Sequence, residues 1–217
     1  MATDAVLPVH QARSRESLRK LLDAAREVLG RHGTDGATIA RIARHAGLTP
    51  GSVYRRFKDK ESLVEAAILE ILEQQEETMK TRLTEIATRQ VPLPEFTAML
   101  IGGMVGAYRA NAGLLRGMRQ FMQSRMGSAF WKNASALEAA HFQRTVNLFL
   151  LFRKDIHHPQ PGVAVSLALR MIAGALYSVV VWPMQRTKAT IDLLPVDDDA
   201  LTRELTRAFL SYLGVET

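Results

Sequence analysis

The segment from residue 38 to residue 63 constrains the fold of this chain more than any other feature. Its sequence, TIARIARHAGLTPGSVYRRFKDKESL, predicts a helix, a tight turn at Gly47, a short second helix and the capped start of a third. Two short helices at this spacing are typical of a helix-turn-helix, which lays its second helix in the major groove of DNA. The alternative is an ordinary corner of a helical bundle, and we favour DNA binding because the capping and packing positions all agree.

The first helix of this segment is predicted by its cap and by its apolar spacing. Thr38 is a good N-cap, and the apolar residues that follow at positions 39, 42, 43 and 46 share one helical face. Gly47 suits the end of this helix, because a residue without a Cβ adopts the left-handed conformation easily.

The second helix is predicted in the same way. Thr49 caps it, and Pro50 occupies its first position, where the missing N–H costs no hydrogen bond. Val53 and Phe57, four residues apart, point back to the core. The side chains left on the other side, available to bases or phosphates, are those of Ser52, Tyr54 and Arg55.

Positive charge is concentrated in the same part of the chain. Residues 1–60 hold twelve Lys or Arg and six Asp or Glu, a net charge of +6, whereas residues 61–217 hold sixteen of each. A basic patch confined to one module is typical of phosphate binding, and a generally basic solvated surface does not explain it. Asp59 is also predicted to cap the helix that begins at residue 60, and Lys60, in the first turn of that helix, is placed to contact a phosphate.

The segment resembles the signature of the TetR family of bacterial transcriptional regulators over about residues 15–65. The shared features are a Thr-capped helix, an I-A-x-x-A-G core, a Y-x-x-F pair and a K-x-x-L opening of the fourth helix. In this chain they are supplied by Thr38, Ile42, Ala43, Ala46, Gly47, Tyr54, Phe57, Lys60 and Leu63.

The resemblance implies how each residue would contact DNA. Ala40 departs from the family, since some members carry a base-reading Arg there, and Arg44 is placed one turn further on to share that role. The residues implied to contact phosphates or sugars are Thr38, Thr49, Ser52, Tyr54 and Lys60. Those implied to face base edges are Pro50, Gly51 and Arg55.

Length and periodicity predict an all-α protein of two domains. A chain of 217 residues suffices for a three-helix head and one larger helical bundle. We expect the helix-turn-helix domain in residues 1–60 and a ligand-binding and dimerisation domain in residues 61–217, with about nine helices in all. Besides the two reading helices, the helices expected are 14–31 (capped by Ser14), 60–86, 95–109, 113–125, 128–154, 163–182 and 198–213.

The middle of the larger domain has the composition of a ligand pocket. Met and aromatic residues gather between positions 99 and 152, and such side chains line adaptable apolar cavities. A plain hydrophobic core is the competing interpretation, and we favour it for any one residue taken alone. The predicted ligand contacts are Met99, Met104, Tyr108, Phe121, Met122, His141, Phe142 and Asn147.

The charge of this larger domain averages to zero but is unevenly spread. Residues 96–191 carry a net charge of +9, between segments of −5 (61–95) and −4 (192–217). Either surface ion pairs neutralise this basic stretch, the interpretation we favour, or one or two of its arginines hold an anionic ligand. The arginines concerned are Arg109, Arg116, Arg119, Arg125 and Arg144.

The last two expected helices have apolar faces suited to a homodimer. Helix 163–182 is apolar over most of its circumference, and helix 198–213 carries an apolar stripe, so two helices from each chain would make a two-fold, four-helix interface. Packing within one chain is the alternative, and the family resemblance favours the dimer. The predicted interface residues are Leu169, Ile172, Leu176, Val180, Leu205 and Phe209.

Other classes of protein lack support in the sequence. It contains no cysteine and no G-x-S-x-G, H-E-x-x-H, P-loop or Gly-rich dinucleotide motif, so we predict no enzyme, cofactor or metal site. It shows no signal-peptide apolar region and no run of about 18 apolar residues, so we expect a cytoplasmic protein without a membrane partner.

The predicted function is therefore that of a ligand-responsive DNA-binding regulator. We expect a repressor released from a near-palindromic operator by a small, mainly apolar effector. The alternative is an effector-independent DNA-binding dimer whose C-terminal domain serves only dimerisation or protein recruitment.

Overall fold

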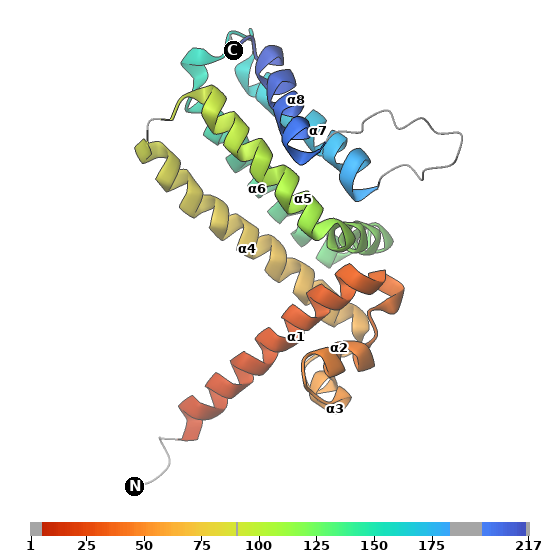
Figure 1. Ribbon diagram of the computed structural model, residues 1–217. Helices are drawn as coiled ribbons and strands as arrows, with labels where there is room; N and C mark the ends of the chain where they lie inside the picture. The colour runs from red at the N-terminus through yellow and green to blue at the C-terminus, as the bar shows by residue number, and fades with distance from the viewer. Residues whose placement is uncertain (1–5, 90, 183–196, 216–217) are drawn as a thin grey trace, which may run out of the picture. The chain divides into compact units, whose positions relative to one another are not determined.

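In the computed structural model, all regular elements of the described residues are helical, which confirms the all-α class (Figure 1). The structure describes residues 6–89, 91–182 and 197–215, with side chains except those of residues 6–12, 76 and 79–89. The elements are α1 (Val6–Gly36), α2 (Ile39–His45), α3 (Pro50–Tyr54), α4 (Lys60–Arg89), α5 (Leu93–Ser124), α6 (Ala129–Leu150), the 3-10 turn η1 (Arg153–Asp155), α7 (Pro161–Leu176), the π-helical turn η2 (Tyr177–Val181) and α8 (Asp198–Tyr212).

The chain divides into two compact units. Unit 1 comprises the chain up to Gln74 together with Gly113–Ser135, and unit 2 comprises Gln75–Ala112 together with the chain from Ala136 onward. Because of these bounds, α4 and α5 each begin in one unit and end in the other. The expected division at residue 60 is one of function rather than packing, and it stays a prediction.

Unit 1 contains the expected helix-turn-helix, formed by α2 and α3. The side-chain oxygen of Thr38 accepts a hydrogen bond of 3.3 Å from the backbone N–H of Arg41. Thr49 caps α3 in the same way, at 3.3 Å from the N–H of Ser52. Gly47 has a φ of +66°, the left-handed conformation that ends α2 and turns the chain. Both predicted caps and the predicted turn are confirmed.

α1 begins at Val6, about two turns before the start that its apolar spacing predicts. Pro8 lies in its first turn, where a missing N–H breaks no helical hydrogen bond. The expected cap at Ser14 is therefore wrong, because Ser14 lies inside the helix. Near the other end, Gly33 has a non-helical φ of +66° and interrupts α1 before Gly36.

α5 is one helix where the sequence predicted two, so the expected nine helices are eight α-helices in the residues described. We expected a turn at residues 111–113 because Asn and Gly often end helices. Instead the helix bends at Asn111 (φ −117°, ψ 17°) and continues to Ser124. The side-chain Nδ2 of Asn111 donates to the carbonyl oxygen of Ala107 at 2.9 Å, a local bond that accompanies the bend.

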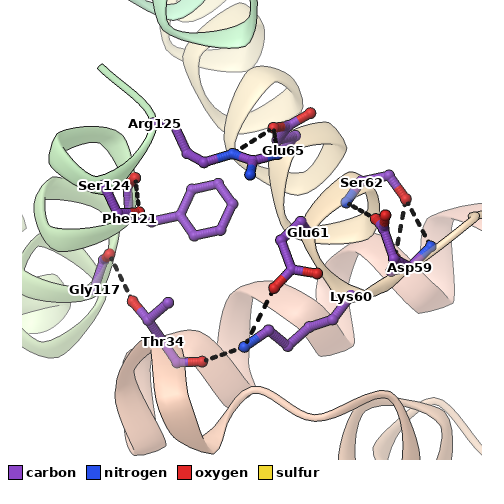
Figure 2. Close-up of polar contacts among 10 residues, drawn as sticks. All are labelled: Thr34, Asp59, Lys60, Glu61, Ser62, Glu65, Gly117, Phe121, Ser124 and Arg125. Atoms are coloured by element: carbon purple, nitrogen blue, oxygen red, sulfur yellow. Dashed lines mark hydrogen bonds and ion pairs between the residues drawn. The ribbon is translucent and has the colours of Figure 1, made fainter. Parts of the chain in front are cut away.

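Two glycines in the second half of α5 allow it to pack closely on α1 within unit 1. A Cβ at Gly113 would overlap the carbonyl oxygen of Gly30, and one at Gly117 would lie 2.9 Å from Cγ of Leu29. The hydroxyl of Thr34 also donates to the carbonyl oxygen of Gly117 at 3.4 Å (Figure 2). Gly113 is thus needed for helix packing and not for the turn that we predicted.

Unit 2 has its own hydrophobic core, built from the first half of α5 with α6, α7 and α8. Aromatic rings are central to it: the ring centroids of Phe96 and Phe149 lie 5.0 Å apart, and those of Phe149 and Phe209 lie 4.7 Å apart. Contacts of this kind add about 0.5–1.5 kcal/mol each beyond the burial of their area.

The segment Pro161–Val181, which comprises α7 and η2, is apolar over most of its circumference. By length and composition it is able to cross a membrane, with a mean hydropathy of 1.9. Core helices meet the same criterion, and the inner side of this segment lies in the core of unit 2 through Ala164, Val165 and Ala168. We interpret it as a core helix that also has an apolar outer side.

Candidate nucleic-acid interface

α3 turns one side to the core of unit 1 and the other side outward. Val53 is fully buried, whereas the next residue, Tyr54, is 59% exposed. This alternation is the one predicted from the sequence. The other residues predicted to contact DNA from this helix are exposed or half-buried: Pro50, Gly51, Ser52 and Arg55.

A short chain of hydrogen bonds runs along the outer side of α3. The hydroxyls of Thr49 and Ser52 lie 3.0 Å apart, and Nη2 of Arg55 donates to Oγ of Ser52 at 3.0 Å. These bonds hold the guanidinium of Arg55 along the helix. A guanidinium has five N–H donors, so Arg55 retains donors for a base edge while it keeps this bond.

α2 is fastened to α1 at both of its ends. Nη1 of Arg41 donates to the carbonyl oxygen of Gly36 at 2.7 Å, and Nε2 of His45 lies 2.8 Å from Oε2 of Glu27. The predicted DNA contacts Thr38 and Arg44 are exposed on this helix. The structure therefore leaves Thr38 and Arg44 accessible, while Arg41 and His45 hold the helix in place.

Lys60, the first residue of α4, contacts other residues of unit 1 (Figure 2). Its Nζ donates to the carbonyl oxygen of Thr34 at 3.4 Å and lies 3.7 Å from Oε1 of Glu61. Its side chain is 27% exposed. A phosphate at this position would share the ammonium of Lys60 with the carbonyl oxygen of Thr34 in α1, a contact that was not predicted from the sequence.

Asp59 caps α4, as predicted. Its Oδ1 accepts a hydrogen bond of 2.8 Å from the backbone N–H of Ser62, and its own N–H donates to Oγ of Ser62 at 3.2 Å (Figure 2). The hydrogen bond from the Ser62 backbone lowers the pKa of the Asp59 carboxyl below its ordinary value of 3.8. The cap is therefore a charged one at neutral pH.

Arg125, just past the end of α5, forms an ion pair with Glu65 of α4 (Figure 2). Its Nε and Nη2 lie 3.0 Å and 2.6 Å from Oε1 of Glu65. The hydrogen bond to Glu65 raises the pKa of the guanidinium. Because both residues belong to unit 1, this pair and the close approach at Gly113 and Gly117 attach the second half of α5 to the helix-turn-helix domain.

Known proteins resemble this chain in the segment just described and beyond it. The family model for bacterial regulatory proteins of the tetR family matches residues 21–67. The HTH-type transcriptional regulator BetI of Escherichia coli is 26% identical over 193 residues, which cover 89% of this chain and 91% of that protein. The helix-turn-helix segment of this chain is therefore that of the TetR family, and most of the chain is similar to a transcriptional regulator of the helix-turn-helix type.

Solved structures of other regulators share the fold of this chain. FadR from Bacillus subtilis, solved in complex with stearoyl-CoA, is 18% identical with a TM-score of 0.64, over 89% of this chain and 98% of FadR. NalD, the secondary repressor of the MexAB-OprM multidrug efflux pump in Pseudomonas aeruginosa, is 22% identical with a TM-score of 0.61, over 93% of this chain and 98% of NalD. At these identities the likeness concerns the fold alone.

The predicted ligand contacts are distributed over both units. Phe121 and Met122 are buried in unit 1, where the ring of Phe121 meets that of Phe130 at 5.6 Å. In unit 2, Met104, Tyr108 and Phe142 are half-buried and pack against the core. His141 is half-buried, and Met99 and Asn147 are exposed. The set as a whole stays a prediction.

Ion pairs are formed by Arg109 and Arg125, which are among the arginines considered for an anionic ligand. Nε of Arg109 lies 2.8 Å from Oδ1 of Asp198, and Arg125 pairs with Glu65. A further arginine that the sequence did not single out, Arg170 on α7, places its guanidinium 4.6 Å from the ring centroid of Phe142.

The predicted dimer residues lie within the core of unit 2. Leu169, Ile172, Leu176, Val180 and Phe209 are at most 5% exposed, and Leu205 is half-buried against the same core. The outer side of α7 is instead formed by other apolar residues. Its exposed members are Val163 (60%), Leu167 (45%) and Met171 (47%). Hydrophobicity alone does not distinguish the two sides of a helix that is apolar over most of its circumference.

Proposed function

We propose that this chain is a TetR-family repressor that binds a near-palindromic operator as a homodimer and releases it when a small, mainly apolar effector binds. The DNA-binding part rests chiefly on the outer side of α3, where Tyr54 and Arg55 are exposed while Val53 anchors the helix in the core. The net charge of +6 on residues 1–60 supports it, because phosphate neutralisation favours binding to any duplex. We expect the protein to act in the cytoplasm, where it meets DNA, and to catalyse no reaction.

In the proposed complex, phosphate contacts set the position of the head and base contacts supply the specificity. The residues assigned to phosphates or sugars are Thr38, Thr49, Ser52, Tyr54 and Lys60. Those assigned to base edges are Arg44, Pro50, Gly51 and Arg55. A Cβ built on Gly51 would have only one neighbour within 4 Å, Oγ1 of Thr49 at 3.9 Å, so packing in the free protein does not require glycine there. A close approach of DNA to the backbone at this position would require it.

The effector site is proposed for unit 2, around half-buried aromatic residues. Tyr108 meets Tyr177 edge to face at 6.1 Å, and burial raises the pKa of Tyr108. The guanidinium of Arg170 lies over Phe142. Aromatic surface next to a cation favours a mainly apolar effector with an acidic group. FadR, which shares the fold, was solved with stearoyl-CoA, which joins an apolar acyl chain to a polar part with anionic phosphates.

Effector binding is proposed to reach the head along α4 and α5, since each of these helices has one part in unit 1 and the other in unit 2. In unit 1 the second half of α5 is held by Gly113, Gly117 and the Arg125–Glu65 pair. A ligand that displaces the first half of α5 would strain these contacts. The effector releases DNA only if it binds the released conformation better than the DNA-bound one.

A screen of ligands tests the effector part of this proposal. Apolar acids, neutral aromatics and cations are added to the purified protein, and both its thermal unfolding and its release from a bound duplex are measured. We expect apolar acids to stabilise the protein and release DNA, and Arg170→Gln to lose the response to acids more than that to neutral aromatics. Ligands that stabilise the protein without changing its DNA affinity would contradict the coupling, and the absence of any ligand would favour the effector-independent dimer.

A further inference from the structure

Residues 13–16 of α1 lie outside the core of unit 1. The helix begins at Val6, and the first buried residue among its described side chains, which start at Arg13, is Leu21. All four side chains from Arg13 to Glu16 are exposed. In Figure 1 this end of α1 extends beyond α2 and α3, which belong to the same unit. We call residues 6–16 the α1 projection.

The α1 projection is attached to the end of the DNA-reading helix. Arg56 directly follows the C-cap residue of α3, and its Nη2 donates to Oγ of Ser14 at 3.1 Å. This bond joins two segments that are 42 residues apart in the sequence. The eight residues of helix before Ser14 extend for about 12 Å, and the major groove that would hold α3 is about 12 Å wide. A duplex held by α3 therefore presents a phosphate backbone within reach of the projection.

The charges of this surface are available to a ligand. Arg13 and Arg15 flank Ser14, and with Arg56 they make three exposed cations. Among the residues that the structure describes, no carboxylate forms an ion pair with any of the three. Glu16, which would otherwise offset them, is paired with Lys20 at 2.8 Å.

We propose that Arg13, Arg15 and Arg56 form a second DNA-contact surface, which binds phosphates of the duplex beside the half-site that α3 reads. This inference rests on the proposed DNA-binding function. Phosphate is the group that suits the site, because guanidinium matches its oxygens in a bidentate way and because α3 already occupies the groove that exposes the bases. Contacts of this kind fix the position of a protein on DNA without reading its sequence.

Salt dependence of DNA binding gives the test. The probe is the duplex that the full chain selects from a random-sequence pool, and the variant is Arg13→Gln combined with Arg15→Gln. The control, Arg153→Gln combined with Arg203→Gln, removes the same charge from exposed positions of unit 2. For each protein, the association constant is measured against salt concentration for the selected duplex and for a scrambled one.

The expected result is a shallower salt dependence of the projection variant only. Each lost phosphate contact reduces the magnitude of the negative slope of log K against log salt by about 0.9. Because the variant lacks two arginines in each head, the reduction is about 1.8 for each head. The ratio of affinities for selected and scrambled duplexes should not change. Replacing both arginines by lysine should restore most of the slope, which excludes a loss of helix structure as the cause.

Three outcomes would overturn the inference while the wild type still binds DNA: a slope equal to that of the wild type, an equal change in the control variant, or a loss of preference for the selected sequence. Failure of the wild type to bind any duplex would instead contradict the proposed function itself.

Discussion

Among single residues, Arg55 and Lys60 are expected to play different parts in DNA binding. Arg55→Ala should weaken preference at particular base positions by about 1–3 kcal/mol, because a bidentate contact discriminates between bases. Lys60→Ala should weaken binding to all sequences about equally, because a phosphate carries no base information. Binding of each variant to a set of single-base operator variants measures the difference.

Lys60 needs a control because it also bonds the carbonyl oxygen of Thr34. Thermal unfolding of Lys60→Ala shows how much of its effect comes from the fold. If both variants lose affinity uniformly across the operator variants, Arg55 is not a base reader and its assignment is wrong.

Asp59 is expected to make the stability of unit 1 depend on pH. Its pKa is lowered in the folded chain, so its stabilising contribution is present above the ordinary value of 3.8 and is lost as the pH falls through the lowered value. Unfolding by denaturant should show Asp59→Ala to be less stable than the wild type at neutral pH, and the difference should shrink below pH 3.8. Asp59→Asn keeps a capping oxygen without a titrating group, so a pH-dependent difference that persists between Asn and Ala would contradict the account.

At the level of helices, the two halves of α5 should respond oppositely to the same substitution. Gly113→Ala should destabilise the protein by about 1–3 kcal/mol, because the new Cβ would overlap the backbone of Gly30 in a packed contact. Gly106→Ala is the matched control, since nothing lies within 4 Å of a Cβ built there, and it should stabilise the helix by up to about 1 kcal/mol. Denaturant unfolding of both variants tests this, and equal effects would mean that α5 does not pack on α1 as described.

The helices that could be predicted are those with local signals. Thr38, Thr49 and Asp59 each cap the helix that follows by accepting a hydrogen bond from the backbone N–H three residues ahead. Gly47 ends α2 by its own backbone preference, so the helix-turn-helix could be located from the sequence alone. The continuity of α5 could not be predicted, because the reason for a glycine at position 113 is its close contact with the backbone of Gly30 in α1, a residue distant in the sequence. The surroundings of Lys60 were missed for the same reason, since its partner Thr34 lies 26 residues away.

The outer side of α7 was also beyond prediction from the sequence. Leu167 and Leu169 are equally apolar, and only the core of unit 2 shows that Leu169 is buried and Leu167 exposed. In other helices an amphipathic pattern distinguishes the buried side from the exposed side, and α7 lacks such a pattern. The interface residues predicted on α7 therefore lie on its inner side.

For the whole molecule, the homodimer is proposed to form through the outer side of α7. Leu167→Glu combined with Met171→Glu places two charges on an exposed apolar stripe, so it should shift the protein from dimer to monomer without changing its helix content. Sedimentation velocity measures the change. Leu151→Glu is the control, because Leu151 is also exposed (62%) but lies outside α7. A double variant that remains dimeric would show that the dimer forms elsewhere.

Two helix-turn-helix heads are proposed to read DNA as a symmetric pair, and selection from a random-sequence duplex pool at several salt concentrations is the direct test. The selection should enrich a near-palindrome whose half-sites lie about 34–36 Å apart, or a multiple of that spacing. Affinity for this duplex should fall steeply as salt increases. Enrichment of no palindrome, or an affinity that does not change with salt, would contradict this proposal.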